Sequence, residues 1–163
     1  MAVRVEYFQG LRKGSPFYGR PRPLAEVQAG LLDRCLQSVE LPAGWLVQCG
    51  GGWEGWSPRD WEPRLQGWKI HVSATPECAV ETLARTTRVC VEAGVSFKFL
   101  PTLAGLTEAS SKNQARGAAG KFITIYPDDD DQLGELLSVL AGVLRGQEGP
   151  YILSDLRYVP DAP

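Results

Sequence analysis

The chain has a single histidine and no excess of charge of either sign. Its 17 Lys and Arg residues nearly balance 19 Asp and Glu residues, giving a formal net charge of −2 and an isoelectric point near 5.5. This balance provides no bulk electrostatic attraction for nucleic acid or an anionic membrane. We therefore expect neither as a partner, and any cationic site must be local.

Long apolar runs and closely spaced cysteines are also missing. No stretch approaches the roughly 20 apolar residues of a membrane-spanning helix, and the N-terminus lacks the apolar segment of a signal peptide. These absences predict a cytoplasmic protein. No C-x-x-C pair is present and one histidine is too few to complete a zinc site, so we expect reduced thiols, no metal and no cofactor. The cysteines are Cys35, Cys49, Cys78 and Cys90.

The length of the chain predicts a single domain. With 163 residues, 44% of them apolar, it can bury one hydrophobic core but not comfortably two. We expect residues 1–23 to form an N-terminal strand, Val3–Phe8, followed by a basic, proline-rich loop. The core of the domain is expected in residues 24–163.

Periodicity predicts an α+β fold with a mixed or antiparallel sheet and packed helices. Helices are expected over Leu24–Val39, from Thr75 to Gly94, and from the acidic run Asp128–Asp131 to Gly146. That acidic run could coordinate a metal, but acids at a helix N-terminus complement the helix dipole, so we favour a cap. Strands are expected over Trp68–Ala74, Val95–Leu100, Phe122–Tyr126 and Tyr151–Ser154.

A segment rich in Gly and Pro, Pro42–Gly67, is expected to be packed but irregular. Its large aromatic side chains favour covering the edge of the core over binding a peptide, although peptide binding stays open. These side chains are Trp45, Trp53, Trp56 and Trp61.

Two predicted strands carry candidate chemistry. A period of two places Lys69 and His71 on one face of the first strand and Trp68, Ile70 and Val72 on the other. A lone histidine is commonly structural, but a lysine on the same face weakens that interpretation. In the second strand Lys98 is either an exposed lysine or, if partly buried near other cations, a neutral amine that can act as a general base.

A loop of small residues between Arg116 and Lys121 could bring backbone N–H groups and a guanidinium onto a phosphate. It is not an ATP-binding P-loop, because the G-x-x-x-x-G-K-[ST] spacing is absent and Phe122 follows the lysine. Arg157 is a further candidate phosphate ligand, or else a surface residue paired with Asp155.

Together, four segments resemble the N-terminal lyase domain of class III and class IV lanthipeptide synthetases. They are GWKIHVSATPE at 67–77, FKFL at 97–100, RGAAGKFITIYP at 116–127 and GPYILSDLRY at 149–158. That domain is similar to the phosphothreonine lyases of bacterial effectors. The resemblance implies a lyase-like fold and elimination of phosphate from a phosphorylated leader–core precursor peptide, leaving dehydroalanine or dehydrobutyrine.

The resemblance also implies residue roles. It makes Lys98 the base and His71 the acid, with Tyr126 as a third catalytic residue. It assigns the phosphate to Lys69, Arg116 and Arg157, and the neighbouring Lys121 is a further candidate ligand. Kinase and cyclase domains, in the same protein or as separate chains, are the implied partners.

The chain departs from the family pattern after Arg157, because the synthetases continue into a strand with a further arginine and then into other domains. We therefore expect either a domain excised from a larger lyase–kinase–cyclase protein or a free-standing lyase. An alternative function is a leader-peptide or phosphopeptide recognition module without turnover, motivated by the missing strand and the Trp-rich segment.

Overall fold

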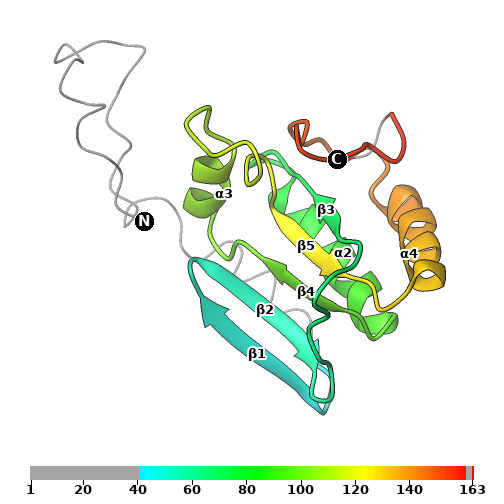
Figure 1. Ribbon diagram of the computed structural model, residues 1–163. Coiled ribbons are helices and arrows are strands. Elements are labelled where there is room, and N and C mark those ends of the chain that lie inside the picture. The colour runs from blue at the N-terminus through cyan, green and yellow to red at the C-terminus, as the bar shows by residue number, and fades with distance from the viewer. Residues whose placement is uncertain (1–40, 161–162) are drawn as a thin grey trace, which may run out of the picture.

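The computed structural model describes residues 41–160 and residue 163 (Figure 1). The predictions for residues 3–8, the loop that follows them, and the helix at 24–39 lie outside the described residues.

The described residues form a five-stranded antiparallel sheet with the strand order β1-β2-β4-β5-β3. Because β3 and β4 both pair with β5, β5 lies between them. The chain that leaves β3 and passes through a helix therefore returns to the sheet as β4, on the other side of β5. The predicted α+β fold with an antiparallel sheet is confirmed. The strands are β1 Trp45–Gly50, β2 Trp53–Pro58, β3 Ile70–Val72, β4 Ser96–Phe99 and β5 Ile123–Tyr126.

Three helices accompany the described part of the sheet: α2 Ala79–Glu92, α3 Leu103–Ala109 and α4 Asp130–Val143. Figure 1 shows α2 behind the sheet with α4 beside it. The helix predicted from Thr75 begins later, at Ala79, because Thr75 accepts the N–H of Cys78 in a preceding turn. The predicted end is confirmed, since Gly94 adopts a φ of +66° just after the helix.

The acidic run before α4 acts as the predicted helix cap. The side chain of Asp129 accepts a hydrogen bond of 2.8 Å from the N–H of Gln132, and Asp130 and Asp131 lie in the first turn. Carboxylates in these positions satisfy free N–H groups and complement the helix dipole. Within the described residues, no group of three or more His, Cys, Asp or Glu side chains could hold a metal ion.

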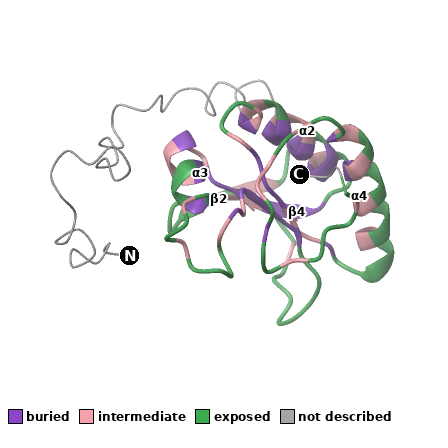
Figure 2. Ribbon diagram, turned by 90° about the horizontal axis from the view of Figure 1, so that it is seen from above, coloured by how far each residue is buried: buried purple, intermediate pink, exposed green. Residues whose placement is uncertain are grey.

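One face of the sheet forms the hydrophobic core. Alternate strand residues on this face are buried against the helices, and Figure 2 shows the buried positions concentrated in the sheet and on the inner sides of the helices. No described helix has the length and apolar character needed to cross a bilayer. The central strand residues of the core face are Ile70, Val72, Phe97, Phe99, Ile123 and Ile125.

The prediction of an irregular segment over 42–67 is wrong for its first half, which forms the β1–β2 hairpin. Gly51 and Gly52 have φ values of +59° and +82°, and two consecutive residues with positive φ form the tight turn that suits the twist of a hairpin. The pairing runs from Trp45 opposite Pro58 to Gly50 opposite Trp53. The glycines therefore connect two strands.

Two smaller predictions also fail. Tyr151–Ser154 is not a strand, because Pro150 has no N–H for a ladder and the chain turns where Asp155 N–H donates to the Ile152 carbonyl. Trp68 is not part of the core face: it precedes β3 and its side chain is 66% exposed.

Candidate functional site

His71 and Lys98 lie in one row across the sheet, on the face opposite the core. Thr124 of β5 pairs with His71 of β3 on one side and with Lys98 of β4 on the other. Directly opposed residues of antiparallel strands point to the same face, and strands are spaced about 4.8 Å apart, which puts the two Cα atoms on the order of 10 Å apart. We call this surface the site face.

Aromatic rings and amines meet on the site face around Lys98. Its Nζ lies 4.7 Å from the ring centroid of Trp53 and 6.0 Å from that of Tyr126. The Nζ of Lys69 lies 5.6 Å from the same Tyr126 ring, and the Trp61 ring packs at 5.8 Å on its flank. Tyr126 therefore connects the two lysines of the two predicted strands.

The four tryptophans of the 42–67 segment divide between the two faces. Trp45 and Trp56 pack on Phe97 in the core, with centroid distances of 6.4 and 5.8 Å, as the favoured interpretation predicts. Trp53 and Trp61 contact residues of the site face. Trp53 also packs against the core cluster, so covering the edge of the core accounts for three of the four indoles.

The other end of the row is an ion-paired cluster around His71. The Nδ1 of His71 bonds to Oδ2 of Asp155. The second oxygen of this carboxylate lies 3.5 Å from Lys121 Nζ and accepts a hydrogen bond of 2.6 Å from the Ser154 hydroxyl. Because Asp155 holds Nδ1, Nε2 is the nitrogen of His71 left for proton transfer.

The pKa values in this cluster favour a neutral imidazole facing an ionised carboxylate. Burial lowers the pKa of His71, with Lys121 and Lys69 acting in the same direction and Asp155 opposing them. Burial by itself raises the pKa of Asp155, but the hydrogen bond from Ser154 and the proximity of His71 outweigh it and leave the pKa lowered. The cations and Asp155 thus exert opposite effects on the His71 proton.

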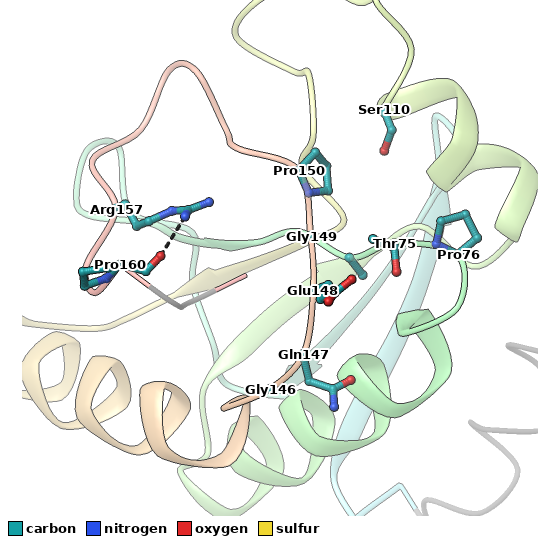
Figure 3. Close-up of a pocket in the computed structure, with 11 residues that line it drawn as sticks. Thr75, Pro76, Ser110, Gly146, Gln147, Glu148, Gly149, Pro150, Arg157 and Pro160 are labelled. Carbon is teal, nitrogen blue, oxygen red and sulfur yellow. Dashed lines mark hydrogen bonds between the residues drawn. The ribbon is translucent and has the colours of Figure 1, made fainter.

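Arg157 lines a pocket of about 760 Å³ that also contains Lys69, His71 and Asp155. The alternative interpretation pairs Arg157 with Asp155, but the described ion pairs of Asp155 are with His71 and Lys121. Arg157 Nη1 instead donates a hydrogen bond of 2.8 Å to the Pro160 carbonyl, and the guanidinium lies 5.0 Å from the Tyr151 ring. Figure 3 shows this hydrogen bond at the rim of a second pocket of about 720 Å³.

Arg116 does not join the cluster. It is exposed in the turn at 116–120, and it makes no hydrogen bond or ion pair with any residue that the structure describes. The structure thus brings Lys69, Lys98 and Tyr126 together, and His71 with Lys121, while Arg157 shares a pocket with His71.

The sequence of residues 33–163 matches the family model described as RamC, N-terminal domain. The chain belongs to the RamC N-terminal domain family. It is also 38% identical over 148 residues, or 90% of its length, to the "Probable SapB synthase" of Streptomyces coelicolor. It spans only 16% of that relative's length. These matches confirm the resemblance at the level of a lanthipeptide-synthetase-like N-terminal domain.

Sequence reasoning missed two contributors to the site of this RamC N-terminal domain. Asp155 was considered only as a partner of Arg157, and its contact with His71 spans 84 residues. Trp53 packs against the core cluster as predicted, but the sequence did not predict its contact with Lys98. The short spacing between Ser154, Asp155 and Arg157 was the available signal for Asp155. No signal in the sequence indicated the role of Trp53.

Proposed function

We propose that the chain is a phosphoserine/phosphothreonine lyase that eliminates phosphate from a phosphorylated precursor peptide in lanthipeptide biosynthesis. The observation that carries this proposal is the cross-strand row in which Thr124 separates Lys98 from His71. A base and an acid lie on one face of the sheet, about two strand spacings apart. In an elimination the base can remove the proton from Cα while the acid protonates the oxygen that leaves Cβ.

In the proposed step, the Lys98 amine acts as the general base and takes the α-proton of the phosphorylated residue. The electron pair of the Cα–H bond forms the Cα=Cβ double bond while the bond from Cβ to the bridging oxygen breaks. His71 gives a proton from Nε2 to that oxygen as phosphate leaves. Lys98 ends as an ammonium and His71 as a neutral imidazole, and exchange with solvent restores both.

The phosphate itself completes the acid. Burial, Lys121 and Lys69 all lower the pKa of His71 in the free protein. A phosphate dianion bound by these lysines offsets their effect and, together with Asp155, favours the imidazolium that donates the proton. Arg157, in the same pocket, and Arg116, on its exposed turn, are the proposed guanidinium ligands, and Tyr126 is proposed to orient both site-face lysines.

The partners are part of the proposal. The chain spans 16% of the length of its relative, which supports further domains in a longer protein. We propose that these are kinase and cyclase domains that supply the phosphopeptide and consume the dehydrated product, in the same protein or as separate chains. We propose a cytoplasmic location for this sequence of reactions and no cofactor for the elimination.

The test is release of inorganic phosphate from a phosphoserine peptide, with dehydroalanine detected by mass spectrometry as loss of phosphoric acid. Lys98→Ala is expected to abolish turnover, and Arg88→Ala, on an exposed position of α2, is expected to leave it unchanged. The proposal fails if phosphate stays on every phosphopeptide tried, or if Lys98→Ala is as active as the wild type.

The second candidate is a recognition module that binds a leader peptide or phosphopeptide without turnover. Trp53 and Trp61 on the site face and the exposed Trp68 favour it, because accessible aromatic rings are common in peptide-binding surfaces. It predicts that phosphorylated or leader peptides bind in a titration while no phosphate is released.

A further inference from the structure

The long side chain of Lys98 can adopt many rotamers. Its amine must be held in one place to act as a base. Ordering a free lysine costs rotamer entropy, and no described carboxylate forms an ion pair with this one. Its nearest described partners are two rings, and the indole of Trp53, at 4.7 Å, is closer than the phenol of Tyr126, at 6.0 Å. The indole is also the largest aromatic side chain, so it offers the lysine side chain the widest face to pack on.

The β1–β2 hairpin fixes the position of Trp53. Gly50 pairs with Trp53 where the hairpin turn closes, and Gly55 pairs with Lys98 on the next strand. Trp53 is therefore the diagonal neighbour of Lys98 on the site face, within reach of a large ring. Gly55 has no side chain to stand between them.

We propose that Trp53 is a positioning residue that holds the Lys98 amine in place on the site face. This proposal rests on the proposed lyase function and adds to it. The indole constrains the amine at one end of the row, with Thr124 and His71 beyond it, so that the amine meets the α-proton of a bound phosphopeptide. In Trp53→Ala the ring is absent, so Lys98 is still present but its amine is no longer held in place.

The kinetic test uses the full chain and a phosphoserine peptide. Trp53→Ala is expected to lower kcat about tenfold with little change in KM, because losing the ring leaves the base out of position without removing phosphate ligands. Trp53→Phe, which keeps a ring, is expected to recover most of the rate. Val47→Ala, at a half-exposed position of the same hairpin, is the control and is expected to behave as the wild type.

A second measurement does not depend on turnover. In NMR spectra of lysine-labelled protein, the ring current of Trp53 is expected to shift the Lys98 side-chain signals upfield, and Trp53→Ala is expected to abolish that shift while the fold is retained. An unshifted wild-type signal, or unchanged kcat in Trp53→Ala, overturns the positioning role alone. If the wild-type signal is shifted but the protein releases no phosphate, the lyase function is overturned. The catalytic purpose of the contact between Trp53 and Lys98 is then overturned as well.

Discussion

The imidazole of His71 and the carboxylate of Asp155 are hydrogen bonded although 84 residues separate them in sequence. Burial and two lysines lower the pKa of the histidine, and the carboxylate is the described group that opposes them. The protonation of His71 is thus a balance that single substitutions can move in either direction. Because His71 is the only histidine of the chain, its titration can be followed without ambiguity.

Asp155→Asn is expected to lower the pKa of His71 further. The substitution removes the negative charge that stabilises the imidazolium and leaves the opposing lysines in place. NMR titration of the single histidine measures this shift. If His71 is the acid of an elimination, the alkaline limb of kcat also moves to lower pH, because the acid loses its proton earlier.

Asp131→Asn is the matched control for that experiment, since Asp131 is exposed in the first turn of α4. It is expected to leave the histidine titration unchanged. An Asp155→Asn variant that titrates at or above the wild-type pKa contradicts the role given to the carboxylate.

Lys121→Gln is expected to shift the titration in the opposite direction. Lys121 lowers the pKa of His71, and its Nζ lies 3.5 Å from the Asp155 carboxylate. Removing the cation therefore raises the histidine pKa in the free protein. The same variant is expected to raise KM for a phosphopeptide several-fold if Lys121 also binds phosphate. A lowered histidine pKa would show that Lys121 acts mainly through another group.

Where strand periodicity applies, the sequence predicts the face of the sheet on which a candidate site residue lies. Alternation in β3 placed His71 on the face opposite Ile70 and Val72, and that assignment is confirmed. It could not place Asp155, because the segment after α4 has no regular period that relates its side chains to the sheet. Contacts of this kind depend on how the chain returns to the sheet, which local pattern does not specify.

The hairpin was missed for a different physical reason. Its alternation is obscured in β2, where Glu54 lies on the core face and accepts a 2.8 Å hydrogen bond from the Trp56 indole, while Trp53 lies on the site face. A polar residue inside and an aromatic one outside remove the period-two signal. Gly51 and Gly52 gave the stronger indication, as a two-residue turn between short extended runs.

The partly buried His71 also predicts how stability depends on pH. Because its pKa is lowered in the folded chain, the unfolded chain binds more protons near the ordinary pKa of about 6.5. Unfolding free energy is therefore expected to rise as pH increases through this range and to level off above it, with a slope of at most about 1.4 kcal/mol per pH unit from this one group. Urea unfolding of wild type and His71→Asn between pH 5.5 and 7.5 measures the difference, and equal slopes would contradict it.

The segment that carries Asp155 is attached at Gly149, where a side chain has no room. A Cβ atom there would contact Ser73 Oγ and would lie 2.7 Å from the Ser73 carbonyl carbon and 2.9 Å from Ala74 N. The neighbouring Glu148 carbonyl accepts a 2.8 Å hydrogen bond from Thr75 N–H, so neither backbone can retreat without losing it. Gly149→Ala is expected to lower the free energy of unfolding by about 1–3 kcal/mol.

The same substitution is expected to lower turnover, because displacing this segment displaces the carboxylate bonded to His71. Gly142→Ala is the matched control: a Cβ at Gly142, within α4, meets no atom within 4 Å. Alanine in place of glycine within the last turn of α4 restricts the unfolded chain, so this variant is expected to gain about 0.5–1 kcal/mol and to keep its activity. Urea unfolding and phosphate release measured on both variants check the pair. A Gly149→Ala variant as stable and as active as Gly142→Ala would mean that the close approach to Ser73 does not fix the segment in solution.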